Sequence, residues 1–222
     1  MWGAAVACPV MHTICVDHPL VAHKLATLRE TQTGSVIFRA LTEELVMLLA
    51  YEATRGLATC DVQVTTPVAP MQGVHLARPR PMVVPVLRAG LGMLAGMLQL
   101  VPIAEVGFVG LVRDEDSLEA TTYAERIPSD LSGRQVFVLD PMLATGGTLI
   151  TVIDSMLARG ARDVTAIVLL AAPEGLARLA EAYDHRDVEV TLVTAAIDER
   201  LNERGYIVPG LGDAGDRLFG VV

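Results

Sequence analysis

Nine consecutive residues, 140–148, constrain the fold of this chain more than any other segment. They follow a mostly apolar run, 135–139, and precede 149–158, where apolar residues recur at helical spacing. The nine residues include two glycines and two threonines, so backbone N–H groups can converge on an anion and hydroxyl groups can add hydrogen bonds. A strand, a small-residue loop and a helix N-terminus in this order predict a phosphate-binding site.

The same loop excludes the two common nucleotide-binding motifs. It lacks the Gly-Lys-Thr or Gly-Lys-Ser ending of a Walker loop, and it lacks the three glycines of the G-x-G-x-x-G fingerprint. Its acid, Asp140, ends the preceding strand, where a sugar hydroxyl could lie. The loop therefore favours a phosphorylated sugar over ATP or NAD.

From residue 82 onward, short apolar runs alternate with helical patterns, which predicts βαβ units. The predicted fold class is α/β, with a mostly parallel sheet flanked by helices. The predicted strands are 82–87, 105–112, 135–139, 164–170 and 189–193, and the predicted helices are 20–30, 35–52, 91–100, 148–159 and 174–182. Because ligands of parallel sheets bind beyond the carboxyl ends of the strands, the loops after Leu87, Val112 and Leu139 should meet at one crevice.

Composition limits the class of protein. The 222 residues are 52% hydrophobic and 19% charged, which suits one α/β domain over 1–222 and excludes extensive disorder. The net charge of −9 argues against a nucleic-acid partner. No stretch of about 18 apolar residues predicts a membrane span. Three cysteines without metal-ligand spacing, and no basic signal region, predict a cytoplasmic protein.

Within this single domain we expect four special segments. Residues 1–16 comprise an extension, which we interpret as dispensable over 1–10, and a first strand. The two helices that follow form an N-terminal arm. Residues 114–126 are polar and acidic without a clear period, so we predict a flexible flap. Residues 205–217 are rich in glycine and read as a binding segment.

Several further motifs occur in one order along the chain: 17–20 (DHPL), 51–54 (YEAT), 84–92 (VPVLRAGLG), 171–175 (AAPEG) and 205–217 (GYIVPGLGDAGDR). Together with 140–148, they closely resemble the uracil phosphoribosyltransferases, a branch of the type I phosphoribosyltransferases. The resemblance extends from about Val16 to the C-terminus. It implies a type I phosphoribosyltransferase-like fold with a C-terminal base-binding hood. It also implies a glycosyltransferase of pyrimidine salvage, which converts uracil and phosphoribosyl pyrophosphate (PRPP) into UMP and pyrophosphate.

The resemblance implies a role for each matching residue. As catalytic residues it implies Arg88, Arg113 and Asp213. Uracil would contact the backbone of Ile207, Gly212 and Ala214, with Asp213 beside it. PRPP would bind to Arg88, Arg113, Asp140, Pro141, Met142, Leu143, Ala144, Thr145, Gly146, Gly147, Thr148 and Asp213.

The resemblance also bears on metals and partners. Many type I relatives have two adjacent acids where this chain has Asp140-Pro141, so we expect no metal held by the protein itself and Mg²⁺ delivered with PRPP. The apolar N-terminal arm and the resemblance imply a homo-oligomer, a dimer or a tetramer. GTP is an effector of some relatives, but no segment here carries a recognisable motif for it.

Other interpretations stay open on the sequence alone. Arg88 and Arg113 could be strand-end arginines that pair with an acid or with solvent, and 205–217 could be an exposed loop. A related fold could regulate by binding RNA, which the net acidity disfavours. A relative could use a purine or orotate, but orotate's carboxylate would require a cation, and none lies between Ile207 and Asp216.

Overall fold

A computed structural model of the chain describes residues 11–113 and 120–220. Its helices are α1 (Pro19–Arg29), α2 (Ser35–Ala53), α3 (Leu91–Leu100), α4 (Gly147–Ala158), α5 (Pro173–Tyr183) and α6 (Ala214–Phe219). Its strands are β1 (His12–Cys15), β2 (Thr59–Thr65), β3 (Pro70–Leu76), β4 (Met82–Leu87), β5 (Glu105–Val106), β6 (Phe108–Arg113), β7 (Ala120–Arg126), β8 (Gln135–Leu139), β9 (Met142–Leu143), β10 (Asp163–Ala171), β11 (Glu189–Ile197), β12 (Arg200–Leu201) and β13 (Ile207–Val208).

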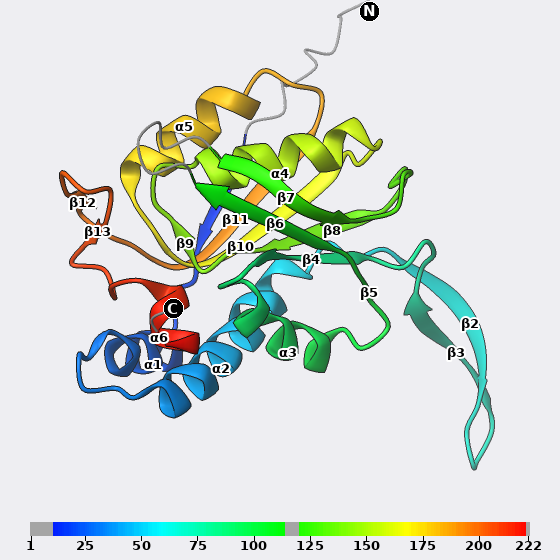
Figure 1. Ribbon diagram of the computed structural model, residues 1–222. Helices are drawn as coiled ribbons and strands as arrows, with labels where there is room; N and C mark the ends of the chain where they lie inside the picture. Colours follow the sequence, from blue (N-terminus) through cyan, green and yellow to red (C-terminus); the bar gives the residue numbers. More distant parts are fainter. Residues whose placement is uncertain (1–10, 114–119, 221–222) are drawn as a thin grey trace, which may run out of the picture.

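The predicted α/β class with a mostly parallel sheet is confirmed. The central sheet has the order β1-β11-β10-β8-β4-β6-β7, with β5 beside β4 and β9 beside β10, and its described pairings are parallel except β6 with β7. Helices α4 and α5 cover one face, and α1, α2 and α3 cover the other (Figure 1). The sheet is therefore buried on both sides, as parallel sheets usually are.

Two apolar clusters fill the spaces between the layers. Val83 and Phe137 pack with the N-terminal helices, whereas their neighbours Val84 and Val136 pack with α4 and α5. Each strand thus sends alternate side chains to opposite faces, and both faces are apolar. This explains why the central strands are continuous apolar runs in the sequence.

Elements bounded by clear turn signals were predicted closely. The strands β4 and β8 and the helix α3 have the bounds expected from the sequence. The expected strand 105–112 is divided at Gly107 into β5 and β6. An ideal Cβ at Gly107 would lie 3.1 Å from the carbonyl oxygen of Arg126, so a side chain there would press on the end of β7.

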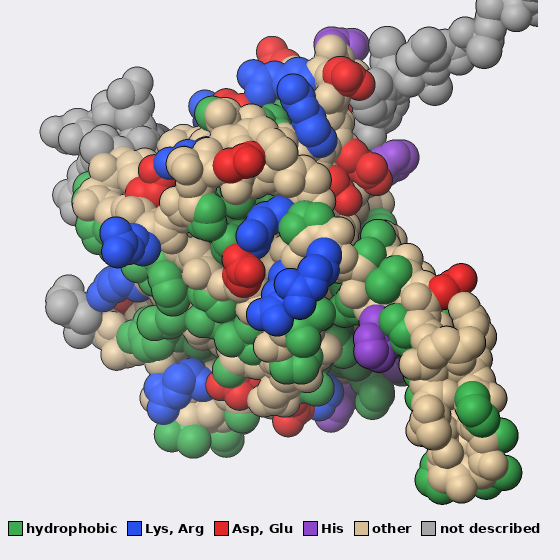
Figure 2. Space-filling model, turned by 90° about the vertical axis from the view of Figure 1, so that its right-hand side faces the viewer, with side chains coloured by type: hydrophobic (Ala, Val, Ile, Leu, Met, Phe, Trp, Pro, Cys, Tyr) green, Lys and Arg blue, Asp and Glu red, His purple; other side chains and the backbone are tan. Residues whose placement is uncertain are grey.

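The sequence analysis missed a long antiparallel hairpin formed by β2 and β3. The two strands pair from Thr59 with Leu76 to Thr65 with Pro70. The hairpin extends well beyond the body of the protein (Figures 1 and 2). Its side chains are mostly exposed, including Val68, Met71 and Val74.

The predicted flap, 114–126, contains a strand that the sequence analysis did not predict. Residues 120–126 form strand β7, which pairs antiparallel with β6 at the edge of the sheet. Tyr123 lies over Gly110 of β6, where an ideal Cβ would come within 2.5 Å of the tyrosine ring. The rest of the predicted flap, 114–119, and the predicted extension, 1–10, lie outside the described residues.

None of the helices in the described part of the chain combines the length and the apolar composition needed to cross a membrane.

The raised pKa of the Asp163 carboxyl group predicts that the stability of the folded protein depends on pH. Burial, and then the neighbouring Glu189 carboxylate, raise the pKa of Asp163 to about 6, and Gln135 donates to it at 3.4 Å. The folded protein therefore holds this proton more tightly than the unfolded chain, so stability falls as pH rises from about 4 to about 6. Because the carboxyl is partly exposed and screened by water, Asp163→Asn should stabilise the protein at pH 7 by only about 1 kcal/mol.

Urea unfolding at pH 4 and pH 7 would measure this effect. Glu189→Gln should give a smaller change in the same direction, because Glu189 is the second cause of the shift. Equal stability of Asp163→Asn and the parent chain at pH 7 would contradict the prediction.

Candidate active site

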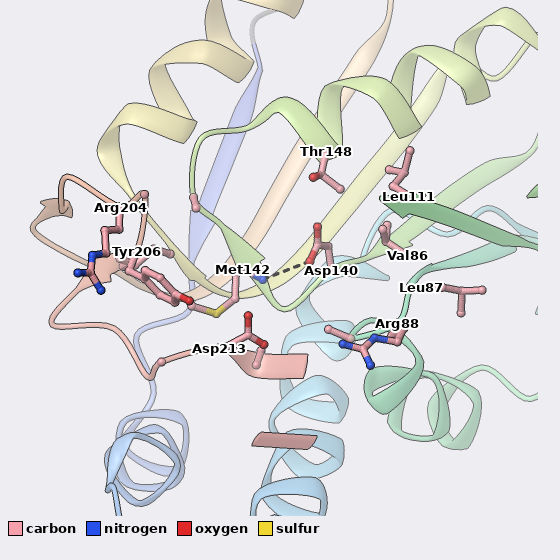
Figure 3. Close-up of a pocket in the computed structure, with 16 residues that line it drawn as sticks. Val86, Leu87, Arg88, Leu111, Asp140, Met142, Thr148, Arg204, Tyr206 and Asp213 are labelled. Atoms are coloured by element: carbon pink, nitrogen blue, oxygen red, sulfur yellow. Dashed lines mark hydrogen bonds between the residues drawn. The ribbon is translucent and has the colours of Figure 1, made fainter. Parts of the chain in front are cut away.

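A cavity of about 640 Å³ lies at the carboxyl ends of β4, β6 and β8. This volume suits a small-molecule site. Figure 3 shows Asp140 near its centre, Thr148 on the α4 side, Arg88 on the β4 side, and Asp213 and Tyr206 on the C-terminal side. The residues that line it are Val86, Leu87, Arg88, Ala89, Leu111, Asp140, Met142, Ala144, Thr148, Arg204, Gly205, Tyr206, Ile207, Gly212, Asp213 and Ala214.

The loop between β8 and α4 forms one wall. Gly146 precedes α4 with φ of +82°, a left-handed conformation that favours glycine, so the chain can turn sharply into the helix. Gly175 lets α5 approach closely from outside, because an ideal Cβ there would lie 2.4 Å from the carbonyl oxygen of Ala144. Asp140 accepts from the backbone N–H of Met142 at 3.5 Å (Figure 3). Thr148, in the first turn of α4, lines the cavity. The positive end of the helix dipole therefore lies beside the cavity.

The loop between β4 and α3 forms the facing wall. The Leu87–Arg88 peptide bond is cis, and the Arg88 side chain is exposed at the cavity. Gly90 allows this loop to contact the end of β8, since an ideal Cβ at Gly90 would lie 2.2 Å from the carbonyl oxygen of Leu139. Arg88 and Asp140 consequently follow two strand ends that are packed directly against each other.

The C-terminal segment, residues 205–217, closes the cavity. Gly210 and Gly212 have φ values of +64° and +83°, and an ideal Cβ at Gly210 would lie 2.1 Å from the carbonyl oxygen of Ile207. Asp213 caps α6, accepting from the backbone N–H of Asp216 at 2.9 Å. The helix then packs on the start of α3, where an ideal Cβ at Gly92 would lie 2.8 Å from the Leu218 side chain.

The short β12–β13 hairpin is held by α5. The Glu174 carboxylate accepts from the backbone N–H of Leu201 at 2.9 Å, and this hydrogen bond is the main reason that the pKa of Glu174 lies below its usual value. Glu174 also lies in the first turn of α5, where the helix dipole favours negative charge. The hairpin that carries Arg204 and Tyr206 is thus anchored outside the cavity.

The structure brings most of the predicted site residues to this one cavity. Arg88, Asp140, Met142, Ala144, Thr148, Ile207, Gly212, Asp213 and Ala214 line it. The predicted residues Pro141, Leu143, Thr145, Gly146 and Gly147 belong to the same loop but are not among the lining residues. Arg113 is the last residue of β6, two residues beyond the lining residue Leu111, and its side chain is outside what the structure describes.

Sequence reasoning missed Arg204 as a lining residue, and it left the position of Tyr206 open. Arg204 lies in the turn between β12 and β13, on the outer side of the cavity (Figure 3). The Tyr206 side chain is 47% exposed and extends toward Met142 (Figure 3), so it is not a core residue. Their positions were the only indication in the sequence that they could line the cavity. Arg204 directly precedes the glycine-rich segment 205–217, and Tyr206 is the second residue of that segment. Arg204 supplies a cation that the sequence argument against orotate did not include.

The acidic side chains at the cavity bear on whether it could hold a metal ion. In residues 11–113 and 120–220, no group of three or more His, Cys, Asp or Glu side chains is placed to hold a metal ion. Asp140 and Asp213 line the cavity as two separate carboxylates. Two carboxylates suit a magnesium ion that keeps most of its other ligands from a bound phosphate group and water.

Comparisons with known proteins agree with this geometry. A family model described as uracil phosphoribosyltransferase matches residues 15–221. Curated uracil phosphoribosyltransferases from a Nocardioides species and from Beutenbergia cavernae are 66% and 68% identical over 212 residues, which is 96% of this chain and the whole of each relative. The solved structure of the AQ2163 protein from Aquifex aeolicus is 41% identical, with a TM-score of 0.88 over 94% of this chain and 98% of that one.

Proposed function

The chain belongs to the uracil phosphoribosyltransferase family, and we propose that the cavity at the carboxyl ends of β4 and β8 is where it converts uracil and PRPP into UMP and pyrophosphate. The observation that carries the proposal is the cavity lining. Asp140 and Thr148 of the phosphate-type loop share one cavity with Ile207 and Gly212 of the C-terminal segment, 59 or more residues away in the chain. A sugar phosphate and a base can therefore meet there.

The loop 140–148 is the proposed site of the PRPP ribose 5-phosphate. The backbone N–H groups from Ala144 to Thr148 precede and begin α4, so they are available at the positive end of the helix. The hydroxyls of Thr145 and Thr148 would donate further hydrogen bonds. Asp140 would then accept from a ribose hydroxyl, which orients the sugar in the cavity.

The pyrophosphate of PRPP would lie against the loop after β4. Arg88 is exposed there and offers a planar guanidinium that suits phosphate oxygens. Arg113, at the end of β6, is the second cation that we propose for the leaving group.

Arg88→Ala tests the pyrophosphate role. The loss of one charge-assisted contact should raise KM for PRPP about tenfold, while KM for uracil stays within about twofold. Initial rates with each substrate varied in turn would measure both constants. An unchanged KM for PRPP would exclude Arg88 from pyrophosphate binding, and Arg80→Ala, in the turn before β4 and away from the lining residues, is a suitable control.

The base would be recognised by the main chain of the C-terminal segment. Uracil presents acceptor, donor and acceptor along O4, N3–H and O2, and the backbone groups of Ile207, Gly212 and Ala214 can match that order. Cytosine presents donor, acceptor and acceptor, so it would leave paired groups unsatisfied at about 1–3 kcal/mol each. The main-chain pocket therefore selects uracil.

The chemistry requires little beyond positioning. As the bond from ribose C1 to pyrophosphate loosens, positive charge develops on the sugar, as in glycosyl transfer generally. The two carboxylates, Asp140 and Asp213, lie beside the region where we place the ribose, and Arg88 lies beside the leaving group. Orientation and electrostatic stabilisation then account for the catalysis.

We propose that Mg²⁺ arrives with PRPP. Bound to the pyrophosphate, the ion would help to neutralise the charge of the leaving group. Asp213 and Asp140 are the residues that could contact it or its water ligands. Release of pyrophosphate with and without a chelator would test the requirement.

A substrate panel tests the proposed function directly. With PRPP and Mg²⁺, release of pyrophosphate should depend on uracil and should be slow with cytosine, orotate and hypoxanthine. Faster release with orotate would mean that Arg204 serves its carboxylate, and it would overturn the assignment to uracil. Addition of GTP to the same assay tests the effector expectation.

We also propose that the chain works as a homo-oligomer in the cytoplasm. A two-stranded hairpin is only marginally stable alone in water, yet β2 and β3 extend from the body with Met71 and Val74 exposed (Figure 2). A second copy of the chain would cover these side chains. Light scattering should give the mass of a dimer or a tetramer, and the mass of one chain would exclude the homo-oligomer.

The cysteines agree with the proposed cytoplasmic location. Both described cysteines, Cys15 and Cys60, are free thiols, as a reducing compartment allows.

A further inference from the structure

The C-terminal segment is attached to the N-terminal helices by arginine side chains. Arg29 at the end of α1 donates to Asp198 and Gly210, and Arg217 of α6 donates to Leu28 at the end of α1 and to Glu30 just after it. Arg39 of α2 donates to the carbonyl oxygen of Leu218 at 2.7 Å. Each contact joins parts of the chain that are 169 or more residues apart.

Asp198 is the centre of the first of these connections. Its side chain is only 5% exposed, and it accepts from both terminal nitrogens of Arg29, at 2.7 Å and 2.6 Å. The same carboxylate accepts from the backbone N–H of Gly210 at 2.8 Å, while Arg29 donates to the Gly210 carbonyl oxygen at 2.7 Å. Both polar backbone groups of Gly210 are therefore held by one partly buried ion pair.

Arg217 holds the other end of the segment. It donates to the carbonyl oxygens of Leu28 at 2.7 Å, Leu211 at 3.0 Å and Glu30 at 2.5 Å. Its guanidinium also lies 4.5 Å from the centre of the buried Phe38 ring. An arginine with this many fixed partners loses its freedom to move, and so does the backbone that it contacts.

Neither Arg29 nor Arg217 lines the cavity, yet Gly210 and Leu211 lie between the cavity residues Ile207 and Gly212. A pocket built from main-chain groups has no side chains that can adjust to a base. Its affinity and its selectivity depend on how well the backbone is held before the base arrives.

We propose that Arg29, Asp198 and Arg217 are positioning residues for the base. The ion pair of Arg29 with Asp198 lies outside the cavity, and it sets the affinity for uracil and the discrimination against cytosine. The proposal rests on the proposed function, in which the backbone of 207–214 contacts uracil. Loss of the ion pair lets Gly210 move, which weakens uracil binding and leaves the PRPP loop in place.

Arg29→Ala and Asp198→Asn test this with kinetics. Each variant should raise KM for uracil about tenfold and lower the ratio of kcat/KM for uracil to kcat/KM for cytosine. KM for PRPP should stay within about twofold of the parent value. Arg29→Lys should recover part of the uracil affinity, because an ammonium restores the charge but not the bidentate contact. Arg134→Ala removes a bridge of similar length, 2.6 Å to Glu105, whose two residues do not line the cavity, and it should change neither constant.

A folded Arg29→Ala with an unchanged KM for uracil would overturn the inference, and so would an equal rise in both KM values. If Arg29→Ala does not fold, Arg29→Lys and Asp198→Asn decide by the same criteria. Failure of the proposed function would look different, because the parent chain itself would release no pyrophosphate in response to uracil.

Discussion

Asp213→Asn is expected to lower kcat about 100-fold or more while the protein keeps its fold. Asp213 lies at the cavity and caps α6 through its carboxylate, which accepts from the backbone N–H of Asp216 at 2.9 Å. Asparagine caps helices about as well as aspartate, so the cap and the position of the segment should remain. What disappears is the negative charge beside the region where we propose that the ribose binds and that positive charge develops during the reaction.

The measurement is kcat at saturating uracil and PRPP, together with the melting temperature. Asp216→Asn is a matched control, because Asp216 belongs to the same helix but does not line the cavity. Its kcat should stay within about twofold of the parent value. Near-normal turnover of Asp213→Asn would remove this carboxylate from the mechanism.

Gly90→Ala is expected to destabilise the protein by about 3 kcal/mol and to abolish most of its activity. The backbone of Gly90, with φ of −61°, suits any residue, so the effect is purely steric. An ideal Cβ would lie 2.2 Å from the Leu139 carbonyl oxygen and 2.7 Å from the backbone of Val86. These are backbone atoms that cannot rotate away, so the loops that carry Arg88 and Asp140 must separate.

Urea unfolding and the rate of pyrophosphate release would measure the two effects. Gly56→Ala is the control, because Gly56 has open space around it and no left-handed φ. It should leave both quantities close to the parent values. If Gly90→Ala were as stable and as active as Gly56→Ala, the close contact between the two strand ends would not be required.

The sequence predicted the elements whose ends carry strong local signals. Strand β8 runs from Gln135 to Leu139 and is followed by Asp140-Pro141, and α3 begins directly after Gly90, so their bounds could be predicted. The β2–β3 hairpin carries a weaker signal, an alternation of Val62 and Val64 with polar residues. Its last residue, Leu76, packs against the core, but most of the hairpin is exposed. Two-residue strands such as β12 and β13 are too short to give any pattern.

The cavity was predictable for two different reasons. The positions of Asp140 and Arg88 follow from physics, because the carboxyl ends of neighbouring parallel strands lie at one edge of the sheet. The approach of 205–217 to that edge depended on resemblance, since glycine-rich sequence alone equally describes an exposed loop. The antiparallel strand β7 was missed because its residues are exposed from Thr122 to Arg126, so this edge strand has no core-facing period.

The ion pair of Arg29 with Asp198 could not be predicted from local sequence. Neither residue belongs to a motif, and 169 positions separate them. Their pairing follows from the tertiary fold, which places the end of α1 beside the loop after β11.

The pairing of early and late segments also bears on how a newly made chain acquires its pocket. Strand β1 pairs with β11 in the sheet. Likewise, Arg29 contacts Asp198, and Leu28 contacts Arg217, which come much later in the chain. During synthesis, the strands up to β10 can emerge before residues 198–217, but the cavity that residues 204–214 line can form only after those residues have emerged. The lining of the cavity is therefore completed only after the segment 205–217 has been synthesised.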